Sequence, residues 1–337
     1  MASTKQFIEK RDNIAAIITY IRERGRATRM EISHALSLSW ACVSDLVSLL
    51  MEEGLIAELS ASSEGAREAK GRTPTCLVLD TESFFLGVDI NDSGIAITEI
   101  SFDGRVRAFR KWNAEPIGCE SELTESCAAK ITEMLAGRDG CFGIGVAMEG
   151  MRASVDTWSY PTGKSTFPYA PKRIFEERFG LPVTVRHDPE CTLYSVICGR
   201  SEDAMAVRID NGIGVAAMKE GKMLDLPLEL GFITVGERKL RDILIEGAES
   251  GSYGDFAREL GVAAGNLAML LGIPKIYIVG GSIRRFYSVE SDFSSALARV
   301  SSKLQYEISG VSDASEGAAL LAVSEFPILP YVSKRQR

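Results

Sequence analysis

The first eighty residues carry hydrophobic positions at the spacing of a small helical domain. Ile14, Ile17, Ile18 and Ile21 lie on one face of a helix that we expect to end at Gly25. The first predicted element is therefore an amphipathic helix, whose apolar face must pack against another part of the protein.

Two shorter helices are predicted next. Thr28 and Glu31 have the spacing of a capping box, which indicates a helix that begins there. After a tight polar turn, Ser39 is placed to cap a third helix over residues 40–52, which Gly54 ends. Strands at 55–59 and 75–79, joined by a loop rich in Ser, Glu and Gly, complete the layout of a winged helix-turn-helix. Three-helix patterns also arise by chance, so the serine cap, the turn and the wing carry this interpretation together.

The third helix would be the recognition helix of such a unit. Its outward face has no Lys or Arg, so base contacts would be few, with Ser44 reaching a base or phosphate and Asp45 accepting from a cytosine amino group. Trp40 either contacts DNA or packs against the end of the second helix. Residues 70–74 would place Arg72 in a narrow minor groove, or else form an ordinary solvated loop. The candidate DNA contacts are Arg29, Ser39, Trp40, Ser44, Asp45, Lys70 and Arg72.

A strand–turn–strand unit occurs twice in the rest of the chain, at 84–98 and 204–217. In each copy an apolar run ends in a polar turn that contains Gly, and a second strand and a Gly hairpin turn follow, which is typical of antiparallel strands. The copies lie about 120 residues apart, too far for a solenoid repeat. We expect two similar lobes whose hairpin tips face each other across a cleft that could cradle phosphates, with two unrelated hairpins as the alternative.

Periodicity predicts the remaining elements of an α/β protein. We expect helices over 121–135, 171–179, 256–271, 289–300 and 316–325, a helix that begins near 193, and strands over 143–150, 183–186 and 275–279. The strand at 183–186 delivers His187 and Asp188 to its carboxyl end, the usual position of a site in an open α/β sheet.

Composition is that of an ordinary globular protein. The 337 residues are 45% hydrophobic and 25% charged, enough for two or three domains. No apolar run approaches the roughly 18 residues of a membrane helix, and the first residues lack the apolar core of a signal peptide. Seven scattered cysteines favour a reducing, cytoplasmic location.

Charge is unevenly distributed. The net charge is −8, yet residues 5–29 hold seven Lys or Arg against three Asp or Glu. Residues 73–337 hold 28 basic and 36 acidic side chains. A short basic segment in front of an acidic body is compatible with a single DNA-contacting module.

The motifs resemble those of the ROK family (repressors, open reading frames and sugar kinases), in particular its repressor branch, over nearly the whole chain. "KGRTP" is similar to the family's wing, "LGVDINDSG" and "DNGIG" to its two phosphate turns, "HDPE" to its catalytic motif, and "IVGGSI" and "EGAALLA" to its closing motifs. The resemblance implies a two-lobed actin-like, sugar-kinase-like (ribonuclease H-like) fold behind the winged helix-turn-helix, and frequent dimerisation. The implied domains are residues 1–80 for DNA binding, 81–196 with a C-terminal helix at about 313–326 for the first lobe, and 197–312 for the second lobe.

The same resemblance assigns candidate ligand contacts. Asp188 stands at the position of the kinase base, Glu229 would hold sugar hydroxyls, and Glu246 is a further candidate sugar contact. His187 is expected to be a packed or hydrogen-bonded neighbour of the ligand site. An Asp that follows a strand can also be a turn residue that bonds its own backbone, which is the alternative for Asp188.

Departures from the family pattern argue against phosphate chemistry. Asn91 and Asp92 replace two glycines of the first turn, and Asp210 replaces a glycine of the second. A carboxylate about 5 Å from a phosphate charge costs on the order of 3 kcal/mol at an effective dielectric near 20. We therefore expect vestigial phosphate loops, whose residues are Asn91, Asp92, Ser93, Asn211, Gly212 and Gly214. The family's zinc loop is absent and Phe232 replaces its histidine, so we expect no metal and no cofactor.

These observations predict a cytoplasmic DNA-binding regulator, a repressor of a sugar-related operon, rather than an enzyme. Its partners would be a DNA operator and a small sugar or sugar phosphate effector, and it would act as a homodimer or a dimer of dimers without a membrane contact. One alternative is an ATP-dependent sugar kinase with an appended DNA-binding domain. The other is a dimer scaffold that binds no ligand.

Overall fold

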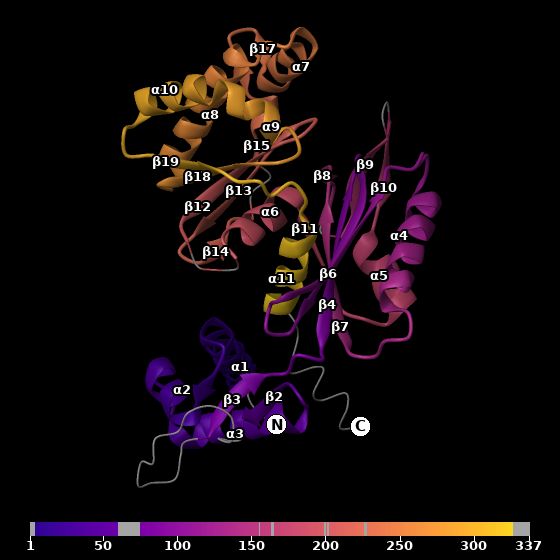
Figure 1. Cartoon of the computed structure of the whole chain (residues 1–337), viewed down its shortest axis with the longest axis vertical. Helices are drawn as coiled ribbons and strands as arrows, with labels where there is room; N and C mark the ends of the chain where they lie inside the picture. Colours follow the sequence, from indigo (N-terminus) through magenta and orange to yellow (C-terminus); the bar gives the residue numbers. More distant parts are fainter. Residues whose placement is uncertain are drawn as a thin grey trace.

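The computed structural model of the chain describes residues 4–59, 75–154, 156–162, 165–198, 200, 202–225 and 228–325. Residues 84–325 form a body of two lobes, and an N-terminal unit, residues 4–59 and 75–79, lies beneath it (Figure 1). Within these ranges no helix has both the length and the hydrophobicity of a bilayer span.

The N-terminal unit consists of three helices and a three-stranded antiparallel sheet. The helices are α1 (Thr4–Arg24), α2 (Arg29–Leu36) and α3 (Trp40–Glu52), and the sheet has the order β1 (Ala27–Thr28), β3 (Cys76–Leu79), β2 (Ile56–Leu59). The predicted capping box of α2 is present, because Thr28 Oγ1 accepts from the Glu31 N–H and the Glu31 carboxylate accepts from the Thr28 N–H. Ser39 Oγ accepts from the Cys42 N–H at 3.2 Å and caps α3, as predicted. The sequence did not indicate β1.

The first lobe is built on a five-stranded sheet, the first sheet. Its order is β11 (Val183–His187), β7 (Cys141–Met148), β4 (Phe84–Asn91), β5 (Gly94–Ser101), β6 (Val106–Asn113). The first repeat of the sequence forms the antiparallel meander of β4, β5 and β6, and β7 and β11 add parallel strands. Helices α4 (Glu120–Leu135) and α5 (Pro171–Phe179) cover one face and share one apolar core with β4 and β7.

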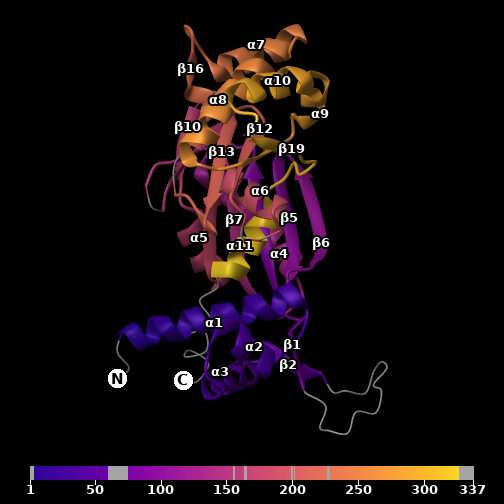
Figure 2. The same ribbon diagram turned by 90° about the vertical axis from the view of Figure 1, so that its left-hand side faces the viewer.

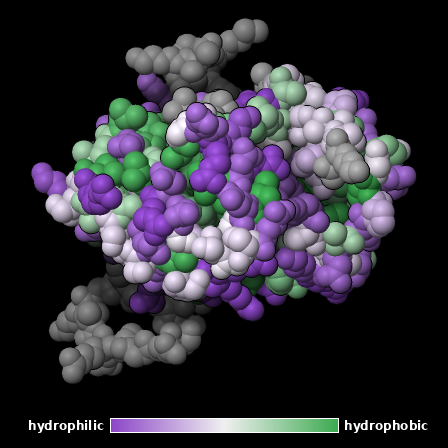
Figure 3. Space-filling view, turned by 90° about the horizontal axis from the view of Figure 1, so that it is seen from above, coloured by the Kyte–Doolittle hydropathy of each residue, from purple (hydrophilic) through white to green (hydrophobic). Residues whose placement is uncertain are grey.

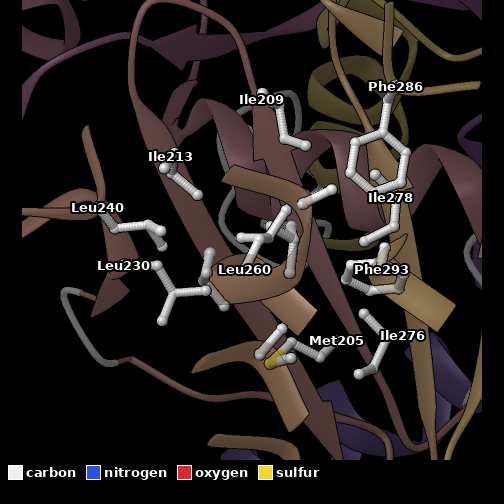
Figure 4. Close-up of a cluster of buried hydrophobic side chains, with 14 of the residues drawn as sticks. Met205, Ile209, Ile213, Leu230, Leu240, Leu260, Ile276, Ile278, Phe286 and Phe293 are labelled. Atoms are coloured by element: carbon white, nitrogen blue, oxygen red, sulfur yellow. The ribbon is translucent and has the colours of Figure 1, made fainter. Parts of the chain in front are cut away.

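The second lobe is built on the second sheet, which contains the second repeat. Its order is β14 (Lys222–Met223), β13 (Ile213–Lys219), β12 (Ala204–Ile209), β18 (Lys275–Val279), β19 (Gln305–Ile308), and β15 (Leu228–Glu229) pairs with β13. Helices α7 (Leu240–Ser250), α8 (Gly254–Leu271) and α10 (Glu290–Val300) cover one face. Figure 4 shows this core, in which Leu260 and Phe293 from the helices meet Met205, Ile276 and Ile278 from the strands.

Two helices lie between the sheets, α6 (Asp188–Val196) and α11 (Ser315–Glu325), and Figures 1 and 2 both place α11 directly above the N-terminal unit. Three glycines permit the backbones to approach closely. A Cβ at Gly87 or Gly145 would collide with the backbone of α11, and a Cβ at Gly317 would collide with the carbonyl of Cys191 in α6. The two sheets are thus joined through tightly packed helices.

The sequence analysis missed several short elements and misplaced one boundary. Unpredicted are the small sheet of β8 (Met151–Arg152), β9 (Trp158–Thr162) and β10 (Ser165–Tyr169), the helices α7 and α9 (Ile283–Phe286), the hairpin of β16 (Thr234–Val235) and β17 (Arg238–Lys239), the strand β19, and the 3₁₀ turns Leu230–Phe232 and Tyr287–Val289. Helix α6 begins at Asp188 and not near 193, because Pro189 occupies the first turn, where a missing N–H costs nothing. Pro161 and Pro168 lie in β9 and β10, and proline is an argument against a strand in sequence alone.

The molecular surface over the helices of the second lobe is mainly hydrophilic. Viewed from the end that carries α7 and α10, hydrophobic side chains gather mostly towards one edge (Figure 3). Val262, Met269 and Leu270 of α8 are exposed, Leu270 by 84%. An exposed apolar strip on a helix is a candidate contact surface.

Candidate functional site

A cleft of about 740 Å³ separates the tips of the two hairpins. The β4–β5 turn and the β12–β13 turn contribute Asp92 and Asn211, and the Asn211 side-chain amide donates to the Asp92 carboxylate across the gap. The prediction that the two hairpin tips face each other across a cleft is confirmed. A volume of this size is sufficient for a small organic ligand.

Asp188 lies at the floor of this cleft as the first residue of α6, directly after β11. Its Oδ2 is 3.0 Å from Arg208 Nε, and its Oδ1 is 3.3 Å from His187 Nε2. Burial raises the pKa of Asp188 to about 7, against the opposing effect of Arg208. The Asp188 carboxylate is therefore held by Arg208 and His187 as well as by a hydrogen bond to its own backbone, so its contacts are compatible with both interpretations of this residue.

His187 and Glu229 flank Asp188, also in the cleft. His187 Nε2 lies 3.6 Å from Glu229 Oε1, and the imidazole packs 5.9 Å from the Trp158 ring. Burial lowers the pKa of His187 and raises the pKa of Glu229. The structure thus brings together three of the four predicted ligand contacts.

Glu246 does not belong to this group, and its predicted role as a sugar contact is wrong. It lies on α7 outside the cleft, is 66% exposed, and is paired with Arg238. The unpredicted helix α7 turns this part of the chain away from the ligand position. Phe232 lines the cleft and is half-exposed, with the Lys239 ammonium 5.6 Å from its ring centre.

Arg208 is the functional residue that sequence reasoning missed most clearly. It is 3% exposed, lies 3.0 Å from Asp188 and 2.6 Å from Asp210, and donates to Thr192 Oγ1 at 2.6 Å. The sequence does offer one signal for Arg208, since it is the single charged residue in the otherwise apolar run 204–209. Because one guanidinium holds a carboxylate at the start of α6 and another in the β12–β13 turn, it fixes the geometry of the cleft floor.

The backbone amides of the first turn, between β4 and β5, are hydrogen-bonded to side chains. The Asp92 N–H donates to Glu149 Oε2 at 2.7 Å, and the Ser93 N–H donates to Asn91 Oδ1 at 2.9 Å. Burial, together with the nearby Asp92 carboxylate, raises the pKa of Glu149 to about 8. Backbone amides of this kind are what a phosphate would need. In this turn they are already occupied.

The second turn adds a carboxylate where an anion would bind. Asp210 accepts from the Gly281 N–H with one oxygen and from Arg208 Nε with the other. Gly214 is required by packing, because a Cβ there would lie 2.6 Å from Pro189 Cγ, whereas a Cβ on Gly212 would meet nothing. Asp210 thus holds the two donors, one backbone and one cationic, that a phosphate group would recruit.

The predicted recognition helix α3 presents the expected face to solvent. Trp40 is 58% exposed, so its ring is not tucked against α2, and Ala41, Asp45 and Ser48 are exposed as well, while Ser44 is half-buried.

Arg29 and Ser39, two of the predicted DNA contacts, have side chains that are engaged within the N-terminal unit. Arg29 is turned inward, with a side chain only 19% exposed and Nη1 2.8 Å from Glu58, so it is not a free cation on this face. Ser39 uses its hydroxyl as the cap of α3. Lys70 and Arg72 lie outside the described residues.

The acidic side chains of the cleft have partners within the chain itself. Within the described ranges no three His, Cys, Asp or Glu side chains gather as a metal site. The carboxylates of the cleft are instead paired with Arg208 and with backbone amides.

Comparison with solved structures identifies the architecture. A ROK family transcriptional regulator, described as a homologue of the E. coli MLC protein, matches with a TM-score of 0.78 and 18% identity over 96% of this chain and 99% of its own. The chain has the ROK fold.

Two ROK proteins with bound ligands also match. A ROK glucokinase from Streptomyces griseus, in complex with glucose and AMPPNP, matches with a TM-score of 0.58 and 18% identity over 71% of this chain and 99% of its own. A ROK protein from Streptococcus pneumoniae, in complex with sucrose, matches with a TM-score of 0.55 and 17% identity over 75% and 100%. No protein-family model and no curated protein sequence matches this chain.

Proposed function

We propose that this chain is a DNA-binding transcriptional regulator of the ROK repressor branch, with a sugar-kinase-like body that senses a ligand and does not phosphorylate it. The observation that carries the proposal is that side chains occupy the places a phosphate would need: Glu149 and Asn91 accept from amides of the first turn, and the Asp210 carboxylate of the second turn accepts from the Gly281 N–H. A ROK fold with these donors occupied is suited to binding rather than to phosphoryl transfer.

The N-terminal unit supports the DNA-binding half of the proposal. Its three helices and small antiparallel sheet have the layout of a winged helix-turn-helix, with α3 as recognition helix. The regulator spans 96% of this chain and the glucokinase 71%, and the difference corresponds in length to an N-terminal segment such as residues 1–80. The proposed contacts on α3 are Trp40, Ser44 and Asp45, with Lys70 and Arg72 from the wing.

The cleft supports the sensing half. We propose that a small sugar or sugar phosphate binds beside His187, Asp188 and Glu229, and that closure of the lobes around it changes the placement of the N-terminal unit. The domains are those of the sequence analysis, residues 1–80, 81–196 with 313–326, and 197–312. The protein would act as a homodimer, for which the exposed strip of α8 is a candidate interface.

Selection from a pool of random duplexes tests the regulator directly. The wild-type protein should enrich one motif, with two half-sites related by inversion. A Trp40→Ala/Asp45→Ala variant should keep its melting temperature, since both side chains are exposed, and lose the enrichment. Failure of the wild-type protein to enrich any motif would contradict the proposal.

A sugar kinase with an appended domain is the second candidate, favoured by the retention of Asp188 and Glu229 in the cleft. Against it stands the ion pair of Asp188 with Arg208, which engages one oxygen of the carboxylate that would act as the base. ATP consumption over a panel of hexoses separates the two, and sustained turnover with any hexose would favour the kinase. Absence of a thermal shift with every sugar and amino sugar tried would favour the scaffold instead.

A further inference from the structure

The contact region between the N-terminal unit and the body, called the joint below, contains an arginine with a buried nitrogen that lacks a hydrogen-bond partner. Arg22 lies in the last turn of α1, with its guanidinium carbon 6.0 Å from the Phe102 ring centre and its Cδ 3.5 Å from where a Cβ on Gly104 would stand. Its Nε is buried and has no hydrogen-bond partner among the described residues. A buried donor without a partner destabilises the folded state, more so when it is charged, so this position is not optimised for stability alone.

The joint is continuous with the interior of the body. Ile17 and Ile21 of α1 share one apolar core with Phe102 of the first lobe and with Ala319 and Val323 of α11. The N-terminal unit and α11 are therefore joined through one continuous apolar core. Figure 2 shows α1 running beneath α11.

Helix α11 is in turn locked to α6, the helix that begins at Asp188 in the cleft. Tyr194 of α6 packs against an apolar cluster that contains Ala318 and Leu321 of α11, and Gly317 of α11 lies against the carbonyl of Cys191 in α6. Because neither backbone has room to move alone, a displacement of α6 displaces α11 as well.

Two groups of the body act on the Arg22 guanidinium. Burial lowers the pKa of Arg22, and the ionised forms of Tyr194, Asp103 and Glu23 oppose that effect, which places Tyr194 and Asp103 of the body close to the guanidinium. Asp103 itself accepts from Ser101 and lies 3.1 Å from Arg105, an arginine that is 80% exposed on its side chain. Arg22 thus has a carboxylate near it that is engaged elsewhere in this arrangement and that a small shift could reach.

We propose that Arg22, with Asp103 and Tyr194, is the joint through which movement of α6 at the cleft reaches the N-terminal unit. Arg22 is unpaired at Nε in the arrangement described here and is paired with Asp103 in a second one. The inference rests on the proposed function, in that a sensing cleft and a DNA-binding unit require such a connection.

Hydrogen exchange on the full-length protein tests the joint without DNA and without a ligand. The substitution Asp188→Asn perturbs the cleft. Its effect on the exchange rates of the α2 and α3 amides is measured in three backgrounds, which are wild type, Arg22→Met and Arg24→Met. Arg24 is an exposed neighbour on α1 and is the matched control. Amides of α8 report on general destabilisation of the second lobe.

In the wild-type and Arg24→Met backgrounds, Asp188→Asn should change exchange in α3 by at least about threefold while α8 is unchanged. In the Arg22→Met background that response should disappear. Asp103→Asn is the second variant should Arg22→Met not fold, and it should also abolish the response. An equal response in all backgrounds, or none in the wild type, would overturn the joint.

Neither DNA nor an effector enters this measurement. A failed exchange experiment therefore leaves the enrichment test for DNA binding untouched, and a failed enrichment leaves the joint untouched.

Discussion

Buried acidic side chains of the cleft make the free energy of unfolding depend on pH. Glu149 holds its proton up to about pH 8 in the folded protein, because burial and Asp92 disfavour its anion. In the unfolded chain it would lose that proton near its ordinary value. Folding therefore takes up a proton between these two values, and the free energy of unfolding falls as pH rises through them.

Glu149→Gln should remove this penalty. The variant keeps an oxygen for the Asp92 N–H, so its free energy of unfolding should exceed that of the wild type by roughly 1–2 kcal/mol at pH 9, allowing for partial solvent screening. The difference should close by pH 5. Urea denaturation at the two pH values measures it, with Glu177→Gln, a change on the exposed face of α5, as control. A constant difference at both values would refute the assignment.

Arg208 should be the most sensitive single residue of the body. Arg208→Met leaves Asp188 and Asp210 without their shared cation and should lower the free energy of unfolding by about 3–5 kcal/mol. Arg258→Met also removes an arginine with two carboxylate partners, but on the surface, and should shift the melting temperature little. Equal effects of the two substitutions in thermal denaturation would count against the role given to Arg208.

At this scale the sequence could predict only part of the site. His187, Asp188 and Glu229 were found because a strand end and a motif point to them. Glu149 was missed because the amide that it binds lies 57 positions away, and Arg208 because Thr192 and Asp188 lie 16 and 20 positions away, although its third partner, Asp210, is near in sequence. Glu246 was misplaced because helix α7 was not predicted.

Among the elements, α6 and α11 connect the two sheets and the N-terminal unit. The backbones of these helices approach their neighbours closely because of glycines. In the sequence alone, such glycines indicate only interruptions of a helix or strand. Gly145 and Gly317 each face a backbone carbonyl of a neighbouring element, so a methyl group has no space at either position.

Gly145→Ala and Gly317→Ala should each lower the free energy of unfolding by about 3 kcal/mol, because the helix backbone must move to admit the methyl group. Gly310→Ala is the matched control, since a Cβ there meets nothing, and should stay within about 0.5 kcal/mol of the wild type. Chemical denaturation gives all three values. Unchanged stability of both packed variants would show that α11 is held less tightly than described.

The long elements were predictable because their periodicity is strong. Helices α1, α3, α4 and α8 carry apolar residues at helical spacing, and the two hairpins carry their turn residues at the tips. The short sheet of β8, β9 and β10 was not predictable, because proline and polar residues dominate it and tertiary pairing alone makes it a sheet.

At the scale of the whole molecule, the N-terminal unit and the two-lobed body share one apolar core. The acidic body and the small N-terminal unit have different surfaces, so DNA should approach through the N-terminal unit alone. The outward face of α3 has no Lys or Arg, which makes few phosphate contacts the expectation. Specificity would then depend on a limited set of base contacts and on the wing.

The most direct test is binding of the purified protein to the DNA upstream of its own gene, against a scrambled duplex of equal length, at two salt concentrations. A preference of about a thousandfold for the upstream DNA, with a shallow salt dependence, is the result expected of a specific regulator with few phosphate contacts. Equal and weak binding to both duplexes would contradict the account at that site.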